Sequence, residues 1–354
     1  MKKSIFEVPF LSAIGMIVTY KCPIACAHCL LKCSPFRKEE ISLRNARDWI
    51  SQVALYRDGY IKMISLTGGE PFFDMDRLKK ISSHAKNEGL VVTAVTNAFW
   101  ADTERNAEKT LANLDSLDAL AISTDKHHQV RIPYRNIENA ITAVQSAGLP
   151  CIINICTEDT ADPFYLALLE KIKERVHPDC IRTVTTFPFG RAENIKRGYQ
   201  LTPDPPKFAC GSCDAPVIFP NGRITACLGP VVDIPGNHPL VLGNLNDQPL
   251  SDILAAADRK AVMHALRLWG PKKLIASVER AGLAKHLPEG YIRDNICSIC
   301  HHLMNTPELR EFLTVLETDP EFIQLVTYGR MYFLDEPDNG MRREIVCNSC
   351  GKLS

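Results

Sequence analysis

Residues 21–35 read KCPIACAHCLLKCSP and place four cysteines within twelve positions, at Cys22, Cys26, Cys29 and Cys33. Four close thiolates suit a tetrahedral zinc ion. The first three alone, spaced Cys-x3-Cys-x2-Cys, suit an iron–sulfur cluster that keeps one iron free of a protein thiolate. The rest of the sequence is needed to distinguish a zinc site from an iron–sulfur site.

The composition is that of an ordinary globular protein. Of the 354 residues, 45% are hydrophobic and 23% are charged, and the 41 basic residues balance the 41 acidic ones. This balance argues against a general nucleic-acid binder or a basic membrane-surface protein. Fourteen cysteines are unusual for a chain that we expect in the cytoplasm, where disulfides are rare. Clustered cysteines there indicate metal binding or thiol chemistry.

The apolar stretch at residues 10–20 follows Lys2 and Lys3, as in a signal peptide. Glu7 and Pro9 interrupt it, and no small-x-small cleavage site follows. It is also too short to span a bilayer. We therefore expect a buried first strand and no membrane association.

Strand-like and helix-like segments alternate over the first 190 or so residues. The predicted strands cover residues 13–20, 60–66, 90–96, 117–123, 151–156 and 181–187. The predicted helices cover residues 43–57, 77–88, 138–147 and 165–176. Such alternation predicts parallel strands with crossover helices, and six units are fewer than the eight of a closed barrel. The fold class predicted is α/β, a partial (β/α)6 TIM-like barrel.

The unusual residues follow the predicted strands. The cysteine stretch comes after the first strand, TGGEP (residues 67–71) after the second, Asn97 after the third and Asp125 after the fourth. In parallel α/β folds, ligands bind at the carboxyl ends of the strands. We therefore expect these residues to meet at one site.

The two motifs in this order resemble the radical S-adenosylmethionine (radical SAM) superfamily, over roughly residues 13 to 190. The resemblance implies that Cys22, Cys26 and Cys29 hold a [4Fe–4S] cluster whose open iron binds S-adenosylmethionine (SAM). It also implies that the TGGEP stretch binds the methionyl amino group of SAM, through Thr67, Gly68, Gly69 and Glu70. The residue types fit, because glycine permits close backbone approach and a carboxylate accepts from an ammonium group.

Four further positions match the family's SAM contacts. The resemblance places His28 near the adenine, and Asn97, Ser123 and Asp125 near the carboxylate or ribose. Each of the strand-end residues also has a plain structural interpretation, since Asn and Asp often cap turns or helices. The zinc alternative, with Cys33 as fourth ligand, stays open but does not explain TGGEP.

A second set of cysteines follows a proline-rich boundary, LTPDPPKFAC (residues 201–210). Its members are Cys210, Cys213, Cys227, Cys297, Cys300, Cys347 and Cys350. The spacing resembles the SPASM and twitch extensions of radical SAM enzymes, which hold auxiliary clusters. We therefore predict a radical SAM core at 1–200 and a SPASM/twitch-like domain with a helical insertion at 201–354.

The second set departs from the full SPASM pattern, because two histidines rather than a further cysteine motif follow Cys300. We expect one auxiliary [4Fe–4S] cluster on Cys210 or Cys213 with Cys227, Cys297 and Cys300. A second cluster, or zinc at Cys347 and Cys350, stays open, as does a structural zinc role for the whole set. Attachment of c-type haem at CSICH (297–301) would require export, and we expect none because the N-terminal stretch is a poor match to a signal peptide.

The resemblance implies reductive cleavage of SAM to a 5′-deoxyadenosyl radical, which takes a hydrogen atom from substrate, and an electron donor such as flavodoxin or ferredoxin. We expect maturation of a ribosomally made peptide by crosslinking, epimerisation or oxidation. The alternatives are a dehydrogenase or epimerase of a sugar or aminocyclitol, and a non-catalytic zinc protein. Cys156, at the end of the fifth strand, is the candidate hydrogen-atom donor, although free cysteines are often simply core residues. Histidines and arginines at 125–135 are candidate substrate contacts.

Overall fold

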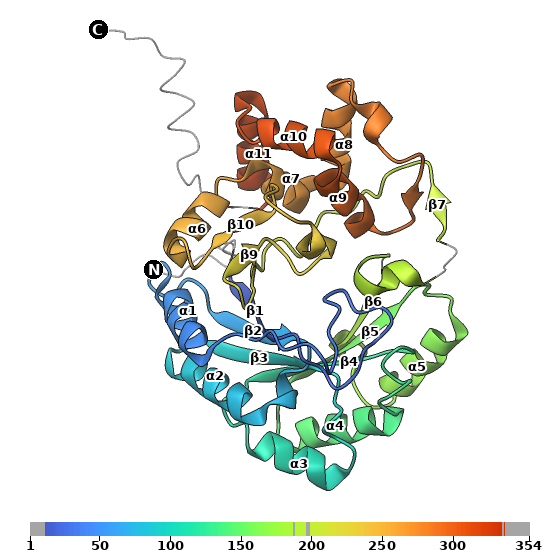
Figure 1. Cartoon of the computed structure of the whole chain (residues 1–354). Coiled ribbons are helices and arrows are strands. Elements are labelled where there is room, and N and C mark those ends of the chain that lie inside the picture. Colours follow the sequence, from blue (N-terminus) through green and yellow to red (C-terminus); the bar gives the residue numbers. More distant parts are fainter. Residues whose placement is uncertain (1–10, 187, 196–198, 335, 337–354) are drawn as a thin grey trace. The chain divides into compact units, whose positions relative to one another are not determined.

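The computed structural model describes residues 11–186, 188–195, 199–334 and 336 (Figure 1). The chain divides into two compact units. The first, called here the barrel unit, contains residues 13–198 and 218–222. The second, called the C-terminal unit, consists mainly of residues 199–217 and those from 223 onward. Each is described by itself.

The barrel unit is built on six parallel strands that pair in chain order, β1-β2-β3-β4-β5-β6. They are β1 (Ala13–Thr19), β2 (Met63–Gly68), β3 (Val91–Thr96), β4 (Ala119–Thr124), β5 (Cys151–Thr157) and β6 (Ile181–Thr185). All six predicted strands are confirmed to within about three residues at each end, a scatter normal for element boundaries. The α/β class and the six parallel strands are therefore confirmed, but the described residues of the barrel unit contain five α-helices, and β6 is followed by the short 3-10 helix η3 (Gly190–Asn194) instead of a sixth.

Five helices connect the strands and follow one side of the sheet (Figure 1). They are α1 (Leu43–Leu55), α2 (Met75–Asn87), α3 (Glu104–Ala112), α4 (Tyr134–Ser146) and α5 (Pro163–Lys173). Helix α1 shows why such segments form: Ser42 caps its first turn, and its buried residues recur every three or four positions. Helix α3 was not predicted, because it buries only Ala107 and Leu111 and so shows little hydrophobic periodicity.

The sheet has a well-buried face and a less buried one. Along β3 and β4, alternate residues such as Val92, Ala94, Leu120 and Ile122 are buried. The residues between them, with Ser123 in register with Asn154 of β5, are half-buried and often small or polar. Side chains alternate across a strand, so Ser123, Asn154 and Cys156 lie on the same, less buried face.

The C-terminal unit is mostly helical. Its helices are α6 (Leu250–Ala257), α7 (Ala261–Trp269), α8 (Pro271–Arg280), α9 (Ile296–Asn305), α10 (Pro307–Leu316) and α11 (Pro320–Phe333). Its short strands are β7 (Leu201–Thr202), β9 (Arg223–Thr225), β10 (Val241–Asn244) and β11 (Tyr291–Ile292), and the unit boundary falls within β8 (Val217–Ile218). The helical region expected from Pro249 to about Leu283 is divided into the three helices α6, α7 and α8. The break between α7 and α8 lies at Gly270, whose φ is +66°, and Pro271 begins α8. Among the described residues no helix is long and apolar enough to cross a membrane.

Candidate active site

The cysteines of residues 22–33 gather in one small cluster after β1. Cys22 and Cys33 are buried with Ile24 and Ile132, and Cys26 and Cys29 pack against them half-buried. Short turns fold the loop back on itself, since the N–H of Cys29 donates to Cys26 O at 3.2 Å. All four thiols are free, so the loop offers sulfur ligands at a single place.

The environment of these thiols is compatible with an iron–sulfur cluster. Burial raises the pKa of Cys22 to about 12, so its proton is lost only in exchange for a strong partner such as a metal. The pKa of Cys29 falls to about 6, chiefly because the Cys33 side chain hydrogen-bonds it. The backbone N–H of Cys33 also donates to Cys29 Sγ at 3.3 Å, the kind of hydrogen bond that tunes cluster sulfur atoms. Cys22, Cys26 and Cys29 therefore fit the predicted cluster, and Cys33 lies beside it.

The two glycines after β2 pack against the start of the cysteine loop. A side chain at Gly68 would place its Cβ 2.3 Å from Thr19 O, and one at Gly69 would place it 2.2 Å from Lys21 O. The N–H groups of Gly69 and Glu70 donate to Thr19 O at 2.7 Å and to Lys21 O at 2.9 Å. The sequence suggested that these glycines admit a ligand; in the structure the close approach is to backbone, and it holds the TGGEP and cysteine loops together.

Glu70 is fully buried and joins three segments. Its Oε1 accepts from the Phe72 N–H at 3.1 Å and the Thr96 hydroxyl at 2.9 Å, and its Oε2 accepts from the Asn97 N–H at 2.7 Å. Burial raises the pKa of Glu70 to about 7 in spite of these donors. A carboxylate oxygen has two lone pairs, so Oε2 has capacity for one more donor, as the predicted ammonium contact requires.

Asn97 has the turn-closing role that the sequence left open as one of two alternatives. Its Oδ1 accepts from the Phe99 N–H at 3.1 Å, which closes a turn after β3. Its Nδ2 also lies 3.6 Å from Cys22 Sγ. The turn thus places the amide directly against a predicted cluster ligand.

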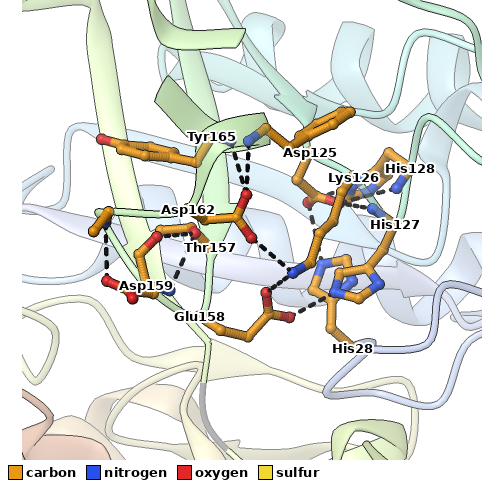
Figure 2. Close-up of polar contacts among 12 residues, drawn as sticks. His28, Asp125, Lys126, His127, His128, Thr157, Glu158, Asp159, Asp162 and Tyr165 are labelled. Atoms are coloured by element: carbon orange, nitrogen blue, oxygen red, sulfur yellow. Dashed lines mark hydrogen bonds and ion pairs between the residues drawn. The ribbon is translucent and has the colours of Figure 1, made fainter. Parts of the chain in front are cut away.

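Asp125 lies at the end of β4, where Oδ1 accepts from the N–H groups of His127 and His128 at 2.7 and 2.9 Å. Its Oδ2 lies 2.7 Å from His128 Nδ1 and 3.3 Å from His28 Nε2 (Figure 2). The His28 ring stacks on the His127 ring with centroids 4.7 Å apart. This buried carboxylate therefore draws the histidine before Cys29 and the loop after β4 into one polar cluster.

The polar cluster continues to the end of β5. Glu158 pairs with His127 Nε2 at 2.7 Å and with Lys126 Nζ at 2.5 Å, and Lys126 also reaches Asp162 at 3.1 Å (Figure 2). The sequence pointed to the histidines of this loop. Glu158 and Asp162 were missed, because a single acidic residue in a loop carries no distinguishing pattern.

Three cysteines lie on or beside β5 and β6, and the structure separates them. Cys156 hydrogen-bonds Asp125, and its pKa is raised first by burial and then by that carboxylate and by Cys26. The pKa of Cys151 is instead raised by burial and, to a smaller extent, by the charge of Cys180. Cys156 alone among these three is therefore placed at the polar cluster. Ser123 shares its face of the sheet.

In the C-terminal unit, five cysteines of the second set lie near one another. Cys210 Sγ and Cys213 Sγ are 3.7 Å apart, and Cys213 also hydrogen-bonds Cys227. Cys297 and Cys300 lie on α9, where burial raises the pKa of both and the thiols of Cys227 and Cys210 add to it. Cys347 and Cys350 lie outside the described residues.

Comparison with known proteins assigns part of the chain to a family. Residues 16–157 match the radical SAM superfamily. The chain is 24% identical over 297 residues, 81% of this chain and 90% of the relative, to the "putative peptide biosynthesis protein YydG" of Bacillus subtilis (strain 168).

Two solved structures show weaker likeness. BtrN in complex with AdoMet and 2-DOIA covers 73% of this chain and 87% of its own at 13% identity and TM-score 0.38. Methylornithine synthase (PylB) covers 50% of this chain and 54% of its own at 17% identity and TM-score 0.40. Both scores are below 0.5, so neither carries an argument. From the match over residues 16–157, the chain contains a radical SAM superfamily domain.

Proposed function

We propose that this protein is a radical SAM enzyme that modifies a ribosomally made peptide. The observation that carries the proposal is the convergence of Cys22, Cys26 and Cys29 in one cluster, bounded by Asn97. When bound, a [4Fe–4S] cluster on these thiolates supplies one electron for the cleavage of SAM to methionine and a 5′-deoxyadenosyl radical. A cytoplasmic reductant such as flavodoxin or ferredoxin supplies that electron.

The chain's own residues orient SAM. The free lone pair on Glu70 accepts from the methionyl ammonium group, and Thr67, Gly68 and Gly69 form the backbone edge beside it. On the other side, His28 offers its ring to the nucleoside, Asp125 holds that ring in place, and Ser123 lies on the same sheet edge. This arrangement holds SAM between the loops after β2 and β4 and excludes water from the bond that breaks.

Peptide as the substrate class rests on the similarity to the peptide biosynthesis protein, which extends over 90% of that protein. Within this proposal Cys156 returns a hydrogen atom to the substrate radical from the opposite face, which gives epimerisation. Its S–H bond breaks as a C–H bond forms, and one electron from the reductant with one proton restores the thiol. Its position beside Asp125 supports this role.

The second cysteine set supports one auxiliary [4Fe–4S] cluster in a SPASM/twitch-like domain at 201–354. Cys210 and Cys213 lie together with Cys227, and α9 supplies Cys297 and Cys300. Five thiols exceed the four ligands that such a cluster uses, so either Cys210 or Cys213 is left over.

The test is an anaerobic preparation of the wild-type chain and of a variant with Cys22, Cys26 and Cys29 all replaced by alanine. We expect the wild type to release 5′-deoxyadenosine from SAM with dithionite, and the triple variant to release none while keeping iron and sulfide on the second set. Zinc without iron in the wild type, or undiminished SAM cleavage by the variant, would refute the proposal. Short peptides encoded beside the gene are then screened by mass spectrometry.

A further inference from the structure

Arg191 contacts the cysteine loop at three points. It stands in the short 3-10 helix η3 (Gly190–Asn194) that follows β6, more than 150 residues further along the chain. Its Nε donates to Cys26 O at 3.0 Å, its Nη2 donates to Cys33 O, and its backbone N–H donates to Cys29 O at 3.1 Å. Two of these three carbonyls belong to predicted cluster ligands, and the third belongs to the buried Cys33.

Gly190 makes this approach possible. It has φ +64°, and an added Cβ would lie 2.5 Å from Leu30 O and 2.6 Å from Cys29 O. Only glycine brings the backbone of η3 this close to the loop. Gly190 and Arg191 therefore act together. Gly190 allows the backbone of η3 to contact the cysteine loop, and the guanidinium group of Arg191 donates hydrogen bonds to that loop.

We propose that Arg191 is the positioning residue of the cluster-binding loop, and that its fixed charge also stabilises the reduced cluster. The inference rests on the proposed function, because it needs a cluster on Cys22, Cys26 and Cys29. A guanidinium group is always charged and presents rigid parallel donors, so it can hold two carbonyls of one loop in a set geometry. It holds the loop in place before the cluster binds.

The charge has a second consequence. Three thiolates and the electron of the reduced cluster add negative charge to a partly buried site, where a nearby cation is screened less than in water. Cluster potentials depend on net charge and hydrogen bonding, so loss of this cation makes reduction harder.

Two substitutions separate geometry from charge. Arg191→Lys keeps the positive charge but cannot donate to both carbonyls at once. Arg191→Gln removes both the charge and the paired guanidinium donors. Arg37 provides a matched control, because it also reaches the loop, at Leu31 O (3.4 Å), but its charge is paired with Glu39 at 2.8 Å. Arg37→Gln should therefore leave the cluster unchanged.

The experiment measures iron, sulfide and the EPR spectrum of the dithionite-reduced full-length chain, with SAM added to identify the signal of the open-iron cluster. We expect both Arg191 variants to lose at least half of that signal per chain. In the fraction that binds a cluster, Arg191→Gln should lower the reduced-to-oxidised ratio about tenfold at a given potential, about 59 mV for a one-electron couple. Arg191→Lys should stay close to the wild type in potential.

Circular dichroism is used to check that each variant is folded. Wild-type occupancy and potential in Arg191→Gln would overturn the inference, and an equal potential shift in Arg191→Lys would overturn its electrostatic part. If Arg191→Gln binds no cluster at all, that loss supports the positioning role, and the potential of Arg191→Lys tests the electrostatic part, because a shifted potential there would overturn it. A wild type without a SAM-responsive cluster would instead refute the proposed function, so the two failures are distinct.

Discussion

The Glu70 carboxylate accepts a hydrogen bond from the backbone N–H of Asn97 at 2.7 Å, which ties the loop after β2 to the loop after β3. The same carboxylate accepts from Thr96, whose hydroxyl in turn accepts from the Ala98 N–H and from Trp100 Nε1. Glu70 thus has a structural role besides its proposed contact with SAM. A substitution there affects both.

Glu70→Gln should lower the free energy of unfolding by about 1–3 kcal/mol, because an amide NH2 facing the Asn97 N–H or the Thr96 hydroxyl leaves a buried donor without an acceptor. The rate of SAM cleavage should also fall, because Glu70 is the proposed contact of the SAM ammonium group. Glu108→Gln, at an exposed position on α3, is the control and should change neither. Thermal unfolding and 5′-deoxyadenosine release measure the two effects. Wild-type values for Glu70→Gln would show that the network is dispensable.

Cys33 and Cys29 should behave differently although their side chains are hydrogen-bonded to each other. Cys29→Ala should remove one whole cluster, measured as iron and sulfide per chain. Cys33→Ala should keep that cluster and cost about 1 kcal/mol of stability from a buried site. Equal loss of metal from both variants, with zinc rather than iron in the parent, would support the four-thiolate zinc site.

Gly190→Ala should displace η3 from the cysteine loop and reduce the occupancy of the first cluster. Gly148→Ala is a matched control, because Gly148 has a similar φ of +65° but nothing within 4 Å of an added Cβ. Both variants carry the backbone strain of a left-handed residue, about 1–2 kcal/mol, and only Gly190→Ala adds the collision. Similar iron content in Gly190→Ala and Gly148→Ala would show that the close approach of Gly190 to the cysteine loop does not control cluster occupancy.

Cys156→Ala should leave SAM cleavage intact and abolish the return of a hydrogen atom to the substrate. With the first peptide found to be modified, we expect the wild-type reaction in deuterated water to place one deuterium at the modified carbon, because the thiol hydrogen exchanges with solvent. Cys151→Ala, on the same strand, should behave as the wild type. Deuterium at the modified carbon of the product formed by Cys156→Ala would show that another group donates the hydrogen atom.

The sequence predicted the sheet well, because β1 to β5 are largely apolar runs bounded by turn residues and β6 is rich in β-branched residues. It also placed the ends of α2 and α4 close to Gly89 and Gly148, where positive φ values of +82° and +65° end a helix. Helix α3 escaped prediction since it buries only two residues. Such a helix forms because it packs against α4, and periodicity cannot show that contact.

The sequence by itself determined the spacing of Cys22, Cys26 and Cys29 on one loop and their order relative to TGGEP, because both are local properties of the chain. Only the tertiary structure decided that Glu70 joins three segments, that Cys156 rather than Cys151 meets Asp125, and that Arg191 reaches the cysteine loop. These contacts join residues 26 to 165 positions apart. The contacts of Glu70 and Cys156 follow from the pairing of neighbouring parallel strands in register, which brings the strand ends together whatever the distance along the chain. The contact of Arg191 joins the segments after β1 and β6, which are not neighbours in the sheet, so it also requires the sheet to curve toward a barrel.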